Sequence, residues 1–152
     1  MRGEQITSPS SQNDFVLLDL ISLEELQEIQ DSFAETFDVY SLITDIHGEP
    51  ITEPSNINKV CQIIRSTPEG LKRCRKSDMV LGSMAANNLR PAYQKCLSCG
   101  FIDASAPIIV KDKHIANWQI SHKSIGVKRE RLIEYSKIIG VQADLLLDVF
   151  ED

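Results

Sequence analysis

Four cysteines, Cys61, Cys74, Cys96 and Cys99, are the residues of this chain whose chemistry is most distinctive. Only the last two form a tight C-x-x-C pair, since the full spacing is C-x12-C-x21-C-x2-C. A zinc ribbon would show two such pairs, so this spacing does not predict one. Three interpretations are open on the residues alone: a shared metal centre, a reversible Cys96–Cys99 redox pair, or buried thiols that pack as small hydrophobic side chains.

Composition and charge limit the partners and the compartment. The chain has 152 residues and a formal net charge of −6 at pH 7, which argues against nucleic acid and against an anionic membrane surface. No apolar run reaches membrane-spanning length, and the first residues, MRGEQITSPSSQND, contain no hydrophobic signal core. We therefore expect a cytoplasmic protein whose partner is a small molecule or another protein. Structural disulfides are rare in the cytoplasm, which leaves metal binding, redox chemistry or burial for the thiols.

The elements that carry the first two cysteines follow from capping residues and apolar spacing. Ser22 and Glu25 form a capping box at the start of an amphipathic helix, SLEELQEIQDSFAETF. The segment VYSLITDIHGEPI predicts a β-hairpin whose turn is supplied by Asp45 and Gly48. Two further helices are predicted to carry the cysteines, in the segments INKVCQIIRS and TPEGLKRCRKSDMVLGSMAANN.

The second half of the chain predicts strands followed by helices. The segments AYQKC, FIDASAPIIV and HIANWQI have β-type composition, and an antiparallel meander is their simplest arrangement. VKRERLIEYSKIIG predicts a helix that ends at Gly140, and VQADLLLDVF begins another. This order of elements is that of a PAS-like domain. We therefore expect an α+β fold, with a five-stranded antiparallel sheet, helices on one face and a C-terminal helical segment.

The sequence resembles the PocR family of sensory domains from about Leu20 to about Ile120. The matching motifs are LEELQEIQDSFAE, DIHGEPITEPS, CQIIRSTPEGLKRCRKSD and YQKCLSCGFIDASAPIIVKDKHIANW. The resemblance implies a PAS-like fold that senses small organic molecules, proposed to be simple hydrocarbon derivatives. It also implies an attached output domain, which in this family is a DNA-binding, histidine kinase or cyclic dinucleotide module.

The predicted sites combine the family motifs with strand alternation. The motifs place Cys61 and Cys74 on neighbouring helices and Cys96 at a strand end, where they can converge with Cys99 on one zinc ion or iron–sulfur cluster. A small organic ligand is expected between the meander and the helices. Its contacts are predicted to come from five strand residues: Tyr93, Asp103, Ser105, Trp118 and Gln119.

The expected organisation has three parts. A disordered tail over residues 1–13 precedes a PocR-like sensory domain over 14–126, and a C-terminal helical segment over 127–152 leads to an output domain outside this chain. Leu132, Tyr135 and Ile139 form an apolar stripe on that segment. The stripe would either contact a second copy in a homodimer or pack on its own domain.

No catalytic constellation is visible in the sequence. The chain contains no nucleophile-elbow signature, no glycine loop that could cradle a phosphate and no zinc-protease motif. We therefore predict a sensory module rather than an enzyme. The alternative is a thiol-based redox sensor or enzyme that uses the Cys96–Cys99 pair.

Overall fold

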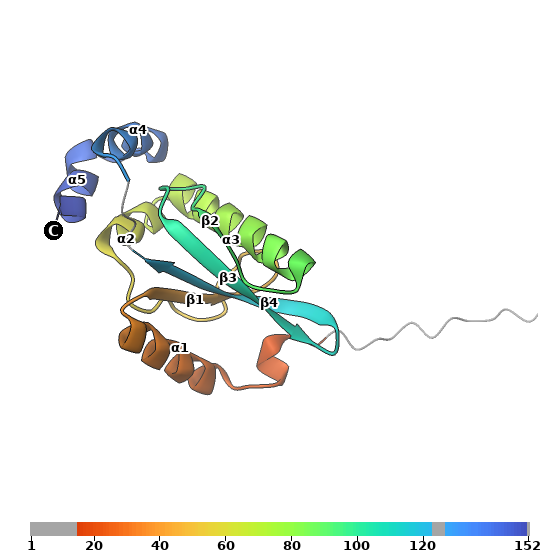
Figure 1. The fold of residues 1–152 in the computed structure, drawn as a ribbon. Coiled ribbons are helices and arrows are strands. Elements are labelled where there is room, and N and C mark those ends of the chain that lie inside the picture. The colour runs from red at the N-terminus through yellow and green to blue at the C-terminus, as the bar shows by residue number, and fades with distance from the viewer. Residues whose placement is uncertain (1–14, 123–126, 152) are drawn as a thin grey trace, which may run out of the picture.

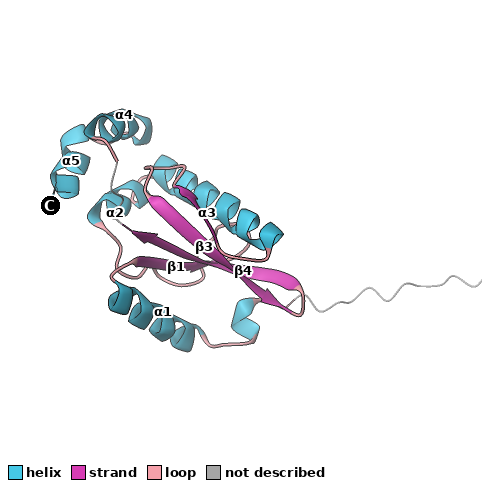
Figure 2. Ribbon diagram, in the orientation of Figure 1, coloured by secondary structure: helices cyan, strands magenta, loops and turns pink. Residues whose placement is uncertain are grey.

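The computed structural model describes residues 15–122 and 127–151, and the tail predicted over residues 1–13 lies outside them. The described residues form an α+β fold of one antiparallel sheet and five α-helices (Figures 1 and 2). In chain order the elements are a 3-10 helix η1 (Leu17–Asp19), α1 (Leu23–Phe37), β1 (Tyr40–Thr44), α2 (Lys59–Arg65), α3 (Pro68–Asn88), β2 (Ala92–Lys95), β3 (Ile102–Val110), β4 (Lys113–His122), α4 (Arg129–Ile139) and α5 (Ala143–Glu151).

Local capping chemistry explains where the helices begin. The Glu25 carboxylate accepts a hydrogen bond from the Ser22 hydroxyl at 2.9 Å, and not from the Ser22 backbone N–H as in a full capping box. Ser22 in turn accepts one from the Glu25 backbone N–H at 3.2 Å, which confirms the predicted N-cap. Asn58 caps α2 in the same manner through the backbone N–H of Cys61 at 2.8 Å. Thr67 caps α3 through Gly70 at 3.0 Å. The sequence therefore contains the start signals of all three helices.

The sheet has the strand order β1-β4-β3-β2, and its paired strands are antiparallel. The meander predicted for the second half of the chain is β2, β3 and β4. Strand β1 comes from the first half of the chain and pairs with β4, so that Leu42 lies opposite Gln119 and Ile43 opposite Trp118. The central position of β4 brings the two halves of the sequence together.

The expected fifth strand is not confirmed, since the sheet of the described residues has four. Residues 50–55, which we call the edge segment, run beside β1 but pair with it only through isolated bridges of Thr44 with Pro50 and of Ser41 with Ser55. Proline has no backbone N–H to donate, and the edge segment contains Pro50 and Pro54. A regular ladder is therefore interrupted where a hairpin was predicted.

The helices cover both faces of the sheet, and the expectation of helices on one face was wrong. Helix α3 packs on β2, β3 and β4, whereas α1 packs on β1 from the other side (Figure 1). Neighbouring residues of β1, Leu42 and Ile43, point to opposite faces, and both are fully buried. A sheet that is apolar on both faces needs a helix on each.

The C-terminal helices belong to the same hydrophobic core as α2 and α3. The stripe of Leu132, Tyr135 and Ile139 is buried in one cluster with Ile64 and Phe101. Of the two alternatives for this stripe, packing on its own domain is therefore the observed one. In the part of the chain that the structure describes, no helix is long and apolar enough to cross a membrane.

Candidate functional site: a buried cavity bordered by four thiols

A small cavity lies between α2, α3 and the sheet. Its free space is about 20 Å³, which is room for one water molecule or a small ion. Charged, polar and thiol side chains border it, together with a few apolar groups. The lining residues are Tyr40, Cys61, Ile64, Arg65, Cys74, Asp78, Cys96, Cys99, Phe101, Asp103, Gln119, Ile120 and Ser121.

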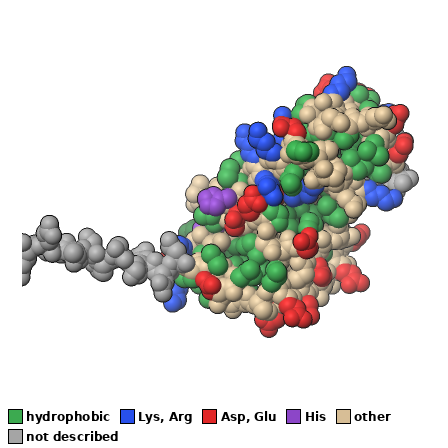
Figure 3. Space-filling model, turned by 180° about the vertical axis from the view of Figure 1, so that it is seen from behind, with side chains coloured by type: hydrophobic (Ala, Val, Ile, Leu, Met, Phe, Trp, Pro, Cys, Tyr) green, Lys and Arg blue, Asp and Glu red, His purple; other side chains and the backbone are tan. Residues whose placement is uncertain are grey.

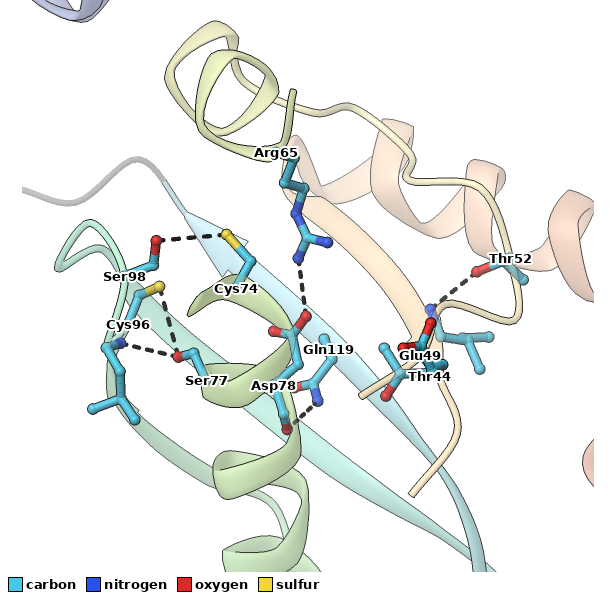
Figure 4. A network of polar contacts seen from close by, with 12 residues as sticks. Thr44, Glu49, Thr52, Arg65, Cys74, Ser77, Asp78, Cys96, Ser98 and Gln119 are labelled. Atoms are coloured by element: carbon cyan, nitrogen blue, oxygen red, sulfur yellow. Dashed lines mark hydrogen bonds and ion pairs between the residues drawn. The ribbon is translucent and has the colours of Figure 1, made fainter. Parts of the chain in front are cut away.

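A buried ion pair joins the two helices over this cavity. Arg65 of α2 contacts Asp78 of α3 with an Nη2 to Oδ2 distance of 2.9 Å, and only 13% and 8% of the two side chains are exposed (Figure 4). The Arg65 guanidinium also lies 5.8 Å from the centre of the Tyr40 ring. Gln119 of β4 donates its side-chain N–H to the backbone carbonyl of Asp78 at 2.9 Å. The pair therefore fixes α2, α3 and β4 around a common point.

Two polar atoms that line the cavity have no hydrogen-bond partner among the described residues. They are the hydroxyl of Tyr40 and the side-chain carbonyl oxygen of Gln119, and both residues are buried. A buried polar group without a partner costs roughly 1–3 kcal/mol, so such groups are uncommon unless something satisfies them. Burial raises the pKa of Tyr40 well above its usual value, and its hydroxyl therefore stays protonated and able to donate.

The carboxyl groups at the cavity are shifted toward their neutral forms. Burial, with the neighbouring Cys96 sulfur, raises the pKa of Asp103 to about 9. At pH 7 this side chain is therefore a hydrogen-bond donor. Burial also raises the pKa of Asp78, but the opposing charge of Arg65 limits the value to about 6. Asp78 therefore remains largely ionised at pH 7, and the cavity carries one buried ion pair beside one neutral acid.

The thiols of Cys61, Cys96 and Cys99 interact with one another. Hydrogen bonds to the sulfurs of Cys61 and Cys96 raise the pKa of Cys99 well above its usual value, so Cys99 is the donor. The same bond, aided by backbone N–H groups of the turn, lowers the pKa of Cys96 to about 5. The Ser77 hydroxyl also donates to the Cys96 sulfur, at 3.7 Å (Figure 4). The hydrogen bond with Cys99 lowers the pKa of Cys61 too, so Cys96 and Cys61 are the two thiols shifted toward the thiolate and Cys99 keeps its proton.

Cys74 has a different environment. Burial raises the pKa of its thiol to about 12, and the thiol donates to the Ser98 hydroxyl at 3.5 Å. Ser98 lies between Cys96 and Cys99 in the turn that joins β2 to β3. This turn closes through a hydrogen bond from the Gly100 N–H to the Cys96 carbonyl at 3.0 Å, with Gly100 at a φ of +91°.

The five ligand-contact residues predicted from strand alternation lie in different parts of the fold. Asp103 and Gln119 line the cavity, and Ser105 is paired with Gln119 across the sheet, with its buried hydroxyl unpartnered among the described residues. Trp118 lies on the other face, where its indole N–H donates to Ser41 at 2.7 Å and its ring meets α1. Tyr93 is 78% exposed on the edge strand β2. The structure therefore brings only part of the predicted set together.

Three cavity residues, Tyr40, Arg65 and Asp78, were missed by sequence analysis. Asp78 carried a usable signal, since it stands four residues after Cys74 and three before Leu81, on the inward stripe of its helix. A carboxylate at such a position needs a buried partner. The partner is on another helix, and its identity is not encoded in local spacing.

The four cysteines come from α2, α3 and the β2–β3 turn and border one cavity, as the family motifs suggested. Within residues 15–122 and 127–151, however, no group of three or more His, Cys, Asp or Glu side chains is arranged so that it could hold a metal ion. The protonated Cys74 thiol, which is bound to Ser98, is the member least suited to ligation. The zinc or iron–sulfur centre therefore stays a prediction.

Comparison with known proteins gives a family match over most of the chain. The family described as the sensory domain found in PocR matches residues 19–152, which include α4 and α5. The Regulatory protein PocR of Salmonella typhimurium (strain LT2) is 30% identical over 90 residues, which are 59% of this chain and 29% of that protein. The aligned part thus spans less than a third of this relative. No solved structure matches the chain significantly.

Proposed function

The chain belongs to the PocR family of sensory domains, and from this premise we propose that it binds a small organic molecule in the buried cavity and relays this event to an output domain. The similarity to a regulatory protein supports a sensory rather than an enzymatic role. The observation that carries the proposal is the pair of unpartnered polar atoms, on Tyr40 and Gln119, beside a buried ion pair.

The chemistry of these atoms defines the ligand class. The side-chain carbonyl of Gln119 accepts a hydrogen bond, and the hydroxyl of Tyr40 donates one, so a ligand hydroxyl group satisfies both. Neutral Asp103 offers another donor. The ionic groups Arg65 and Asp78 already neutralise each other, and the Cys96 sulfur at the same cavity is shifted toward its negative form, which favours an uncharged ligand over an anion. A short alcohol or diol therefore fits this cavity better than a carboxylic acid.

The size of the cavity makes binding a conformational event. A free space of about 20 Å³ holds one water molecule, so an alcohol has to move the walls apart. One wall is α2, whose Val60 and Ile64 pack with Leu146 and Leu147 of α5. We propose that displacement of α2 is passed to α5 through this contact and from there to an output domain beyond the chain.

Binding of a panel of short alcohols, diols and acids, measured by calorimetry and thermal shift, tests this proposal. We expect a hydroxyl compound to bind, and Tyr40→Phe to weaken it roughly 2- to 10-fold through loss of one hydrogen bond. Tyr93→Phe removes an exposed hydroxyl and is the matched control, with unchanged affinity. A panel without any binder, or equal losses in both variants, would contradict the proposal.

A second candidate function is a cysteine-ligated metal centre, either zinc or an iron–sulfur cluster. The observation that favours it is the convergence of Cys61, Cys74, Cys96 and Cys99 from three elements on one cavity. Loading would require Cys74 to leave Ser98 and lose its proton. The homodimer and the DNA-binding, kinase or cyclic dinucleotide output domain likewise stay predictions.

A further inference from the structure

The C-x-x-C turn separates the buried cavity from a groove on the surface. This groove has a volume of about 500 Å³. Cys96 and Cys99 are among the lining residues of both the cavity and the groove. The residues that line the groove are Lys95, Cys96, Leu97, Cys99, Gly100, Val127, Lys128 and Arg131. Cys96, which is half-buried, can therefore be approached from solvent without opening the cavity.

The charges at this groove have one sign. Lys95, Lys128 and Arg131 line it, and no acidic side chain is among its described lining residues. None of the three cations forms an ion pair within the described part of the chain. On the face drawn in Figure 3, the lower rim of the main body is mainly acidic. In a chain of net charge −6, a groove with three unpaired cations attracts anions selectively.

We propose that this groove binds a low-molecular-weight disulfide whose two halves carry carboxylates, and that Cys96 undergoes thiol–disulfide exchange with it. The proposal goes beyond the cavity ligand and does not depend on it. Cys96 is the entry point because it is half-buried at the groove, whereas Cys99 is 2% exposed. The Ser77 hydroxyl donates to the Cys96 sulfur at 3.7 Å and limits the positions that this sulfur can take.

The exchange proceeds in two balanced steps. The sulfur of Cys96 attacks one sulfur of the small disulfide, whose S–S bond breaks and releases the first small thiol with the bonding electron pair. The sulfur of Cys99 then attacks the Cys96 sulfur of this mixed disulfide and releases the second small thiol. Each small thiol leaves as a thiolate and takes up one proton, one of them from the Cys99 thiol and the other from Cys96 or from water. Cys96 and Cys99 are thereby oxidised to one disulfide, and the small disulfide is reduced to two thiols.

Mass spectrometry of the whole chain with three disulfides tests this chemistry. The probes are oxidised glutathione, which carries carboxylates, neutral 2-hydroxyethyl disulfide and cationic cystamine. We expect a Cys96–Cys99 disulfide in the unaltered chain, a stable mixed disulfide on Cys96 in Cys99→Ser, and no adduct on the turn in Cys96→Ser. An adduct confined to Cys61 or Cys74, or none on Cys96 in Cys99→Ser, would overturn the exchange.

Variants that remove positive charge from the groove test its role. Lys128→Gln combined with Arg131→Gln should slow the reaction with oxidised glutathione roughly fivefold, since two cations near the anion are lost. The rate of the same variant with the neutral disulfide should be unchanged, which also shows that the variant is folded. Its rate with cystamine should increase. Arg90→Gln combined with Lys111→Gln removes the same charge elsewhere and should leave all three rates unchanged. Equal slowing for all probes, or in both variants, would exclude the groove.

Discussion

The hydroxyl groups of Ser98 and Tyr135 are hydrogen-bonded to each other, and this bond connects the C-x-x-C turn to α4. Both residues are buried, and Ser98 also accepts the bond from the Cys74 thiol. The Ser98 hydroxyl of the turn therefore links Cys74 in the cavity wall to Tyr135 in α4. A change at the thiols that moves Ser98 also changes the contact with α4.

Removal of the Tyr135 hydroxyl should loosen α4 without creating a cavity. Tyr135→Phe leaves the ring in place and deletes one buried hydrogen bond, for which we expect a loss of about 1 kcal/mol in the free energy of unfolding. Hydrogen exchange of residues 129–139 should accelerate more than that of the sheet. Tyr93→Phe, at an exposed position, is the control. Unchanged exchange in α4 would show that the bond does not anchor the helix.

The Arg65–Asp78 pair should contribute far more to stability than its surface counterpart. Arg65→Leu leaves Asp78 buried without its partner, and such a loss costs about 3–5 kcal/mol. Arg73→Leu breaks the pair with Glu69, in which both side chains are 41% exposed, and should cost less than about 1 kcal/mol. Urea denaturation measures both. If the double variant Arg65→Leu/Asp78→Leu is no more stable than Arg65→Leu, the buried carboxylate is not the source of the loss.

Asp103 should make the protein less stable as the pH rises. Its pKa is raised from 3.8 to about 9 in the folded chain, so between these values the folded state holds a proton that the unfolded state has released. The stabilisation by protonated Asp103 is fully present below about pH 4 and is lost progressively up to about pH 9. Over this range the free energy of unfolding falls by at most about 1.4 kcal/mol per pH unit. We expect the free energy of unfolding of Asp103→Asn to decline less steeply between pH 6.5 and 8.5 than that of the unaltered protein. Parallel curves for both proteins would contradict the raised pKa.

A metal centre on the four cysteines would be coupled to folding. We expect anaerobically purified protein to contain zinc or iron, and Cys74→Ser to lose metal and to melt at a lower temperature. Elemental analysis and the absorption spectrum after Co²⁺ addition report the number of thiolate ligands. Ser98→Ala is the control, because it frees the Cys74 thiol without removing a sulfur. A metal-free, fully folded protein that binds no Co²⁺ through sulfur would refute the prediction.

Local signals in the sequence predicted most of the elements, and long-range pairing decided the rest. The N-cap at Ser22 and the helix stop at Gly140 depend on neighbouring residues only, and both are found in the structure. The convergence of the four cysteines came from family motifs rather than from spacing. Arg65 and Asp78 were missed because they are 13 residues apart on different helices. Strand alternation placed Trp118 and Gln119 on opposite faces, but could not say which face borders the cavity.

The edge segment beside β1 also affects how molecules of this protein meet one another. Its two prolines, Pro50 and Pro54, lack the N–H groups that a strand from another molecule would need. The opposite edge is β2, which is four residues long, follows Pro91 and ends at Lys95. Short strands, prolines and edge lysines are features that natural sheets use against edge-to-edge aggregation. We therefore expect the domain to remain in solution at high concentration without forming intermolecular β-sheet.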